Sequence, residues 1–234
     1  MSPGADPDEI CRGRLAGSQD RQGFLRLFGR SAGSDDVSGF DPRTLAFYQE
    51  SADHYVDDHP RDVASHIPAF LDRLPPAGAI LELGCGGGVD AAYMEERGFA
   101  VEATDGVVAM AAKAEQRLKH PVRVMRFHEL DAVERYDAVV ATASLLHVPK
   151  PELPDVLARI WRALKPGGRH VATYKTGHAA GWDDHQRYYN YLSVEELEAC
   201  YKQAGQWTGL EITASMEKGF FSGPGRWLSI QVQK

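Results

Sequence analysis

Glycines occupy every second position of one short turn, at Gly84, Gly86 and Gly88, and Gly87 is a further glycine between them. The turn follows an apolar stretch over residues 79–83 and precedes a segment with helical character. Glycine adopts positive φ readily and lets a ligand approach the backbone, because no side chain stands in the way. A strand, a glycine turn and a helix in this order predict a site for a nucleotide-like cofactor.

An acidic residue follows at the spacing that such a site requires. The second strand-like run, residues 99–104, ends in Asp105, about 20 residues after the first glycine. A carboxylate at this position accepts hydrogen bonds from ribose hydroxyls. Asp105 is therefore the predicted ribose ligand.

The spacing within the turn discriminates between cofactors. NAD and FAD sites favour GxGxxG or GxGxxA, whereas this turn reads GxGxG and has Val89 where the third glycine is expected. A P-loop needs Gly-Lys-Ser/Thr around a triphosphate, and Val89 and Asp90 supply neither a cation nor a hydroxyl for magnesium. We expect a ligand that is not polyphosphorylated.

The glycine turn and its neighbours resemble the class I S-adenosylmethionine-dependent methyltransferases, whose first motif is hh(D/E)hGxGxG with h apolar. Residues 80–88 match this motif position by position, and Asp105 matches the family's ribose-binding acid. Residues 136–140 match the family's fourth strand, and residues 164–168 match the turn into its fifth. The resemblance covers residues 41–234. It implies S-adenosyl-L-methionine as cofactor and S-adenosyl-L-homocysteine as product.

The order of predicted elements indicates one α/β domain over residues 41–234. The chain of 234 residues is 43% hydrophobic, which suffices for a full core. Two helices are expected over residues 45–55 and 63–74. The expected strands are 80–83, 101–104, 122–127, 138–142, 170–174, 210–215 and 227–232, and the later helices are 89–97, 107–119, 151–164 and 194–204. The last two strands have no helix between them, so one of them should be antiparallel.

The expected architecture is a Rossmann-like class I methyltransferase fold. It has a seven-stranded, mostly parallel sheet with an antiparallel edge strand, helices on both faces and an N-terminal helical cap. Residues 1–40 are rich in Gly, Ser, Asp and Arg, so we expect them to form a flexible or lid-like extension.

Composition limits the partners. A net charge of -7 argues against a nucleic-acid substrate and favours a small molecule. Three widely separated cysteines predict neither a disulfide framework nor a zinc cluster, and no metal is expected. Without a long apolar segment or a secretory leader, a soluble, cytoplasmic, bacterial-type protein with no membrane partner is expected. A homodimer is compatible with the sequence, which does not determine the oligomeric state.

The resemblance implies a set of cofactor contacts around the glycine turn. The set is Tyr48, Tyr55, Glu82, Gly84, Cys85, Gly86, Gly88, Asp105, Gly106, Glu129, Leu130 and Ala143. Tyr48 and Tyr55 match an N-terminal YxxxAxxY pattern that closes over the cofactor in related enzymes, or else they are core aromatics. Glu129 would reach the adenine, or else it is a solvated carboxylate. Cys85 fits as a small turn residue without thiol chemistry.

The candidate base and the candidate acceptor contacts lie further along the chain. His147 follows the fourth strand, where an imidazole with an ordinary pKa near 6.5 suits proton removal, although it could also cap the loop. Lys175 and Arg187 are predicted to grip an anionic acceptor beside His147, while Tyr188 and Tyr189 wall it. A solvated loop pinned to the core by tyrosines is the other interpretation of residues 174–191.

The predicted function is methyl transfer from S-adenosylmethionine to an oxygen, nitrogen, sulfur or carbon atom of a small acceptor, with general-base help from His147. The alternatives are a detoxifying methyltransferase of the tellurite or thiopurine type and a non-catalytic module that binds the cofactor. A dinucleotide oxidoreductase ranks third.

Overall fold

The computed structural model describes residues 40–57, 62–218 and 224–234. These residues belong to one compact unit, Val37–Lys234, and the other unit, Met1–Asp36, lies outside the described part. The predicted extension over residues 1–40 also lies outside it, apart from Phe40.

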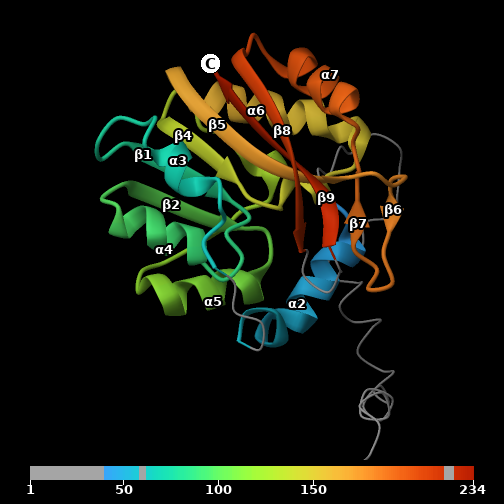
Figure 1. The fold of residues 1–234 in the computed structure, drawn as a ribbon. Coiled ribbons are helices and arrows are strands. Elements are labelled where there is room, and N and C mark those ends of the chain that lie inside the picture. Colours follow the sequence, from blue (N-terminus) through green and yellow to red (C-terminus); the bar gives the residue numbers. More distant parts are fainter. Residues whose placement is uncertain (1–39, 58–61, 219–223) are drawn as a thin grey trace, which may run out of the picture. The chain divides into compact units, whose positions relative to one another are not determined.

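A seven-stranded sheet forms the centre of the unit (Figure 1). Its strands are β1 (Ala79–Leu83), β2 (Ala100–Asp105), β3 (Arg123–Val124), β4 (Tyr136–Ala141), β5 (Leu164–Thr176), β8 (Thr208–Lys218) and β9 (Pro224–Gln233), in the order β3-β2-β1-β4-β5-β9-β8. The first five strands are parallel, and β9 runs antiparallel to both β5 and β8. The predicted fold is confirmed. The antiparallel strand, β9, lies one place inside the edge, and β8 is outermost.

Helices cover both faces of the sheet. Along β1, Ile80 faces the core formed with α3 (Ile67–Leu71) and α4 (Val89–Glu96), whereas Leu81 and Leu83 face α6 (Leu153–Ala163) and α7 (Val194–Ala204). The helix α5 (Val108–Leu118) packs beside α4 through small alanines. Because both faces are buried, β1 and β4 are apolar over most of their length.

Two expected elements are shorter than their patterns predicted. The helix expected over residues 63–74 spans only Ile67–Leu71, and the backbone N–H of Ala64 instead donates to the Asp90 carboxylate at 3.0 Å. The strand expected over residues 122–127 is reduced to Arg123–Val124. It ends early because Phe127–Glu129 forms a 3-10 turn, in which the Glu129 carboxylate accepts the N–H of Arg126.

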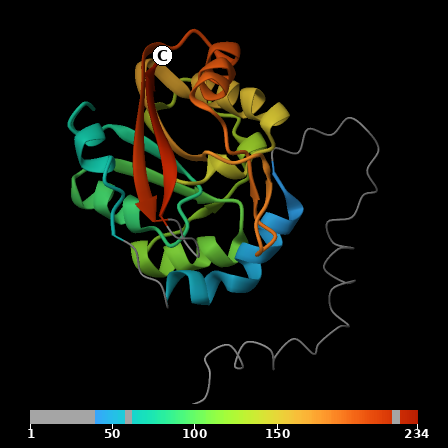
Figure 2. The same ribbon diagram turned by 45° about the vertical axis from the view of Figure 1, so that its right-hand side comes forward.

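A cap helix and a small hairpin lie at the carboxyl ends of the parallel strands. The helix α2 (Pro42–Val56) is fixed to α5, since Lys113 pairs with Asp53 and Asp57 at 2.7 and 2.6 Å. The strands β6 (Gly181–Trp182) and β7 (Tyr188–Tyr189) form the hairpin, and both views of the ribbon show it beside α2 (Figures 1 and 2). The predicted N-terminal helical cap is therefore α2. Among the described helices, none has the length and apolar character that crossing a membrane requires.

Candidate active site

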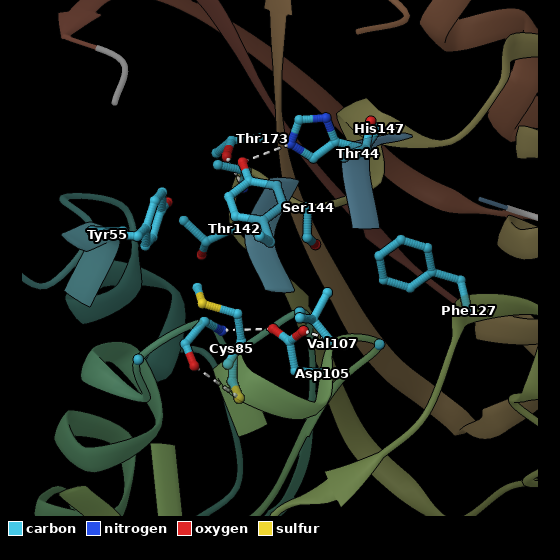
Figure 3. Close-up of a pocket in the computed structure, with 18 of the residues that line it drawn as sticks. Thr44, Tyr55, Cys85, Asp105, Val107, Phe127, Thr142, Ser144, His147 and Thr173 are labelled. Atoms are coloured by element: carbon cyan, nitrogen blue, oxygen red, sulfur yellow. Dashed lines mark hydrogen bonds between the residues drawn. The ribbon is translucent and has the colours of Figure 1, made fainter. Parts of the chain in front are cut away.

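A cavity of about 1050 Å³ opens where β1, β2 and β4 end. Open α/β sheets bind ligands at this position, at the carboxyl ends of strands where the strand order reverses. His147 and Thr173 lie at one end of the cavity and Asp105 at the other, with Tyr55 and Phe127 on the two flanks (Figure 3). The glycine turn and α2 contribute further walls.

The glycine turn needs glycine for two separate reasons. Gly84 has φ +76°, and a Cβ added there would lie 2.5 Å from the Cβ of Ser144. The end of β1 thus packs tightly against Ser144 in the loop that follows β4, and the Ser144 hydroxyl donates to the Leu83 carbonyl at 2.6 Å. Gly86 has φ +57° and space around it, so its constraint is the left-handed backbone rather than a clash. The turn presents bare backbone to the cavity.

The Asp105 carboxylate closes the turn from the end of β2. One oxygen accepts the N–H of Gly86 and the other accepts the N–H of Val107, each at 2.9 Å. Burial raises the pKa of this carboxyl to about 6, against the opposing effect of the two N–H donors. A carboxylate has about four lone-pair sites, so two backbone bonds leave room for ribose hydroxyls. Asp105 lines the cavity, as its predicted role requires.

At the opposite end, a tyrosine from α2 meets the predicted base. The Tyr48 hydroxyl lies 3.1 Å from His147 Nε2, and His147 Nδ1 lies 2.5 Å from the carbonyl oxygen of Tyr188 in β7. A carbonyl only accepts hydrogen bonds, so Nδ1 carries the proton of the neutral ring. Nε2 then holds a lone pair, which accepts the Tyr48 O–H.

The surroundings keep His147 neutral. The pKa of the imidazole is lowered to about 4, chiefly because burial shields the ring from water and also because of the charges of Arg187 and Lys175. The Tyr188 carbonyl and the Asp183 carboxylate oppose this shift. Burial also raises the pKa of Tyr48 well above its usual range. The pair is therefore a neutral phenol and a neutral imidazole near pH 7. The Nε2 lone pair of His147 already accepts the hydrogen bond from Tyr48.

Four of the predicted acceptor contacts, Lys175, Arg187, Tyr188 and Tyr189, lie outside the cavity lining. Arg187 is only 1% exposed, and its guanidinium holds the Asp183 carboxylate through Nε at 2.9 Å and Nη2 at 2.6 Å. Lys175 lies over the ring of Tyr189 at 4.3 Å, and burial lowers its pKa to about 8. None of these side chains is among the cavity-lining residues, and the ring of Tyr189 packs against His147. Tyr188 contributes its backbone, as described above.

The remaining predicted cofactor contacts divide into two groups. Tyr48, Tyr55, Cys85, Gly106 and Ala143 line the cavity, together with Gly84 and Gly86. Glu82 and Leu130 are buried in the fold, Gly88 caps the start of α4, and Glu129 caps the 3-10 turn. Their predicted contacts with the cofactor remain predictions.

Several lining residues are absent from the sequence-based set. They include Asp41, Thr44, His66, Val107, Met110, Arg126, Phe127, Thr142, Thr173 and Trp227. Asp41 carries a recognisable signal, because Asp-Pro at a helix start predicts the N-cap that it forms. Trp227 and Thr173 come from β9 and β5, and only their pairing in the sheet brings them to the cavity.

The strand order and the glycine turn define a Rossmann-like methyltransferase fold, and comparison with known proteins agrees. Residues 80–168 match the family model of a methyltransferase domain. A protein-L-isoaspartate O-methyltransferase from Polaromonas is 32% identical over 108 residues, covering 43% of this chain and 47% of that protein. The chain thus spans about half the length of this curated relative.

Solved structures show the same fold at low sequence identity. A methyltransferase from Methanosarcina mazei has a TM-score of 0.65 at 16% identity, covering 74% of this chain and 99% of that one. A 1,6-didemethyltoxoflavin-N1-methyltransferase from Burkholderia thailandensis has a TM-score of 0.58 at 23% identity, covering 100% of this chain and 92% of that one. The match to the methyltransferase-domain model and these shared folds support the resemblance to the class I S-adenosylmethionine-dependent methyltransferases seen in the sequence.

Proposed function

We propose that this protein transfers a methyl group from S-adenosylmethionine to a small-molecule acceptor. The observation that carries the proposal is one cavity that joins the Asp105 carboxylate and the glycine turn to the Tyr48–His147 pair. A nucleoside end and a reaction end therefore share a single volume. Fold alone does not establish activity, so the proposal rests on this juxtaposition.

The residues present fit the cofactor. The turn at Gly84–Gly86 offers backbone without side chains, Asp105 offers acceptors to ribose hydroxyls, and Phe127 offers an apolar ring for a base. The sulfonium of the bound cofactor supplies the methyl group and its own leaving group. The protein's own residues then need only to orient the acceptor and accept the proton it loses.

We infer that the acceptor is aromatic and carries no negative charge. The cavity wall includes the rings of Tyr48, Tyr55 and Trp227. Among the described lining residues, Arg126 is the one Lys or Arg, whereas Asp41, Asp62, Asp105 and Glu217 are acidic. Aromatic walls with acidic groups favour a flat molecule without negative charge over a phosphate or a carboxylate. The similar Burkholderia thailandensis enzyme binds 1,6-didemethyltoxoflavin and methylates it at N1.

In this site the Tyr48–His147 pair would receive the acceptor's O–H or N–H. The Nε2 lone pair of His147 faces Tyr48, so an acceptor that displaces the Tyr48 hydroxyl meets a neutral base held by the Tyr188 carbonyl. If the hydroxyl stays, Tyr48 lies between acceptor and imidazole. These two cases predict different effects of Tyr48→Phe on kcat.

A labelled-methyl screen tests the proposed function. The purified protein is incubated with methyl-labelled S-adenosylmethionine and separate pools of phenols, nitrogen heteroaromatics, phosphorylated amines, carboxylic acids and thiols. We expect label in the phenol or heteroaromatic pool and its loss in a His147→Asn variant. Transfer confined to the phosphorylated or carboxylic pools would contradict the acceptor class, and no transfer to any pool would contradict methyl transfer to these small-molecule classes.

A further inference from the structure

A chain of hydrogen bonds runs from the first turn of α2 to His147. The Thr44 hydroxyl donates to Asp41 Oδ1 at 2.8 Å and accepts the backbone N–H of Tyr188 at 2.8 Å. The carbonyl of the same Tyr188 accepts from His147 Nδ1. The direction of every bond is determined, since a carboxylate and a carbonyl only accept and a backbone N–H only donates.

We propose that Thr44 is a positioning residue that acts on His147 through the backbone of Tyr188. The hydroxyl donates its one hydrogen bond to Asp41, so an oxygen lone pair is left to accept the N–H of Tyr188 in β7. This bond fixes the position of the Tyr188 backbone relative to α2. The Tyr188 carbonyl then holds the proton of His147 on Nδ1 and leaves Nε2 facing the cavity. This inference rests on the proposed function for its catalytic consequence, but the tautomer of His147 is a property of the free protein.

The hydroxyl of Thr44 is not required for capping α2. Asp41 caps the helix by accepting the backbone N–H of Thr44 at 2.8 Å, a bond that any residue except proline could donate at position 44. The side chain is only 4% exposed, so little solvent is available to replace the acceptor of the Tyr188 N–H. Valine in place of Thr44 would keep the shape and the helix cap while removing the link to β7.

A neighbouring residue provides a matched control. Arg43 also joins α2 to the β6–β7 hairpin, through Gln186 at 3.3 Å and over the ring of Trp182 at 4.9 Å, but it takes no part in the bonds to His147. If the hairpin merely needs attachment to α2, Arg43→Ala and Thr44→Val should have similar effects. If Thr44 acts by positioning, only Thr44→Val should alter His147.

The test compares Thr44→Val, Thr44→Ser and Arg43→Ala with the native full chain. Histidine ¹⁵N spectra of the free proteins report the tautomer, and the His147 signals are assigned by their loss in His147→Asn. We expect the native protein, Thr44→Ser and Arg43→Ala to show His147 protonated on Nδ1. In Thr44→Val the form protonated on Nε2 should become visible, and kcat should fall about tenfold while the Kd for S-adenosylmethionine changes less than about twofold.

Native-like His147 signals in Thr44→Val would overturn the proposal, whatever the activity. The proposal would also be overturned if Arg43→Ala or Thr44→Ser showed the same change in the His147 signals as Thr44→Val. Either result would indicate that the change comes from weaker attachment of the hairpin and not from the loss of the Thr44 hydroxyl. If the spectra behave as expected but the native protein transfers no methyl group, the positioning role stands and the proposed function fails.

Discussion

The Tyr48 hydroxyl lies 3.1 Å from Nε2 of His147, although the two residues are 99 positions apart. The contact places α2 over the loop that follows β4, so the cap helix contributes a side chain to the reaction end of the cavity. Tyr48 also packs edge-on against Tyr55 at 5.3 Å between ring centroids. Both aromatic residues of the predicted lid thus belong to the cavity wall.

Replacing each member of this pair should separate catalysis from cofactor binding. His147→Asn keeps an N–H that can donate to the Tyr188 carbonyl but removes Nε2, so kcat should fall by about 10² or more while the Kd for S-adenosylmethionine stays within about threefold. Tyr48→Phe should lower kcat by about tenfold if the hydroxyl lies between acceptor and imidazole. Steady-state kinetics and calorimetry measure both quantities. A change in cofactor Kd alone for Tyr48→Phe would instead support the lid role predicted from the sequence.

Cofactor affinity should depend on the ionisation of Asp105. The pKa of this buried carboxyl is raised to about 6, so the charged form that accepts ribose hydrogen bonds dominates at pH 7.5 and is lost as the pH falls. If only the carboxylate binds, the Kd should rise by about tenfold between pH 7.5 and pH 5. Asp105→Asn should bind weakly at both values with a flat profile. An equally steep profile in the variant would show that another group titrates.

The chain should tolerate alanine poorly at Gly84, in the glycine turn, and better at Gly98, which follows α4. Both glycines have positive φ, +76° and +88°, so each substitution strains the backbone by roughly 1–2 kcal/mol. Only at Gly84 would the new Cβ meet another atom, 2.5 Å away on Ser144, whereas nothing lies within 4 Å at Gly98. We expect Gly84→Ala to lose about 1–3 kcal/mol more of unfolding free energy. Equal losses in urea titrations would contradict the tight packing of β1 against the end of β4.

Two buried histidines should make the fold sensitive to acid. Burial lowers the pKa of His147 and of His170 to about 4, below the ordinary 6.5. Between these two pH values the histidines are protonated in the unfolded chain but not in the native state. Stability should therefore fall as the pH drops from about 6.5 towards 4, by about 2 kcal/mol per histidine at pH 5. The Asp105 carboxyl has the opposite effect, because its pKa is raised to about 6 and the native state therefore binds its proton more readily than the unfolded chain. This reduces the dependence of the unfolding free energy on pH between its ordinary pKa and about 6.

His170→Gln isolates one of these contributions. Glutamine can still donate to the Val139 carbonyl and accept the Tyr201 hydroxyl, the two partners that His170 contacts at 2.9 Å each. The variant should lose roughly half of the histidine-dependent pH effect on unfolding free energy. A variant as acid-sensitive as the native protein would show that His170 is not held neutral.

The geometry of the glycine turn could be predicted from the sequence because its constraints are local. Gly84 and Gly86 need positive φ within one turn, and Asp105 follows at a spacing set by one strand and one helix. Strand and helix order follows from apolar periodicity in the same way, which explains why the sheet was predicted correctly. The position of β9 between β5 and β8 depends on pairing that a linear pattern does not encode.

The acceptor half is less local, because its predicted ligand contacts rest on charge type alone. Arg187, which is predicted to grip an anion, is bound by Asp183 four residues earlier in the hairpin and lies against the rings of Phe47 and Tyr189. Thr44 carried no signal, since its role depends on the N–H of a strand 144 residues away.

Calorimetric titration of the native chain with S-adenosylmethionine, S-adenosylhomocysteine and NAD, repeated on Asp105→Asn, measures whether this cavity holds the proposed cofactor. We expect saturable one-to-one binding of both sulfur nucleosides, no binding of NAD, and at least about tenfold weaker binding by the variant. Binding of NAD in place of the sulfur nucleosides, or equal binding by the native chain and Asp105→Asn, would contradict the site described above.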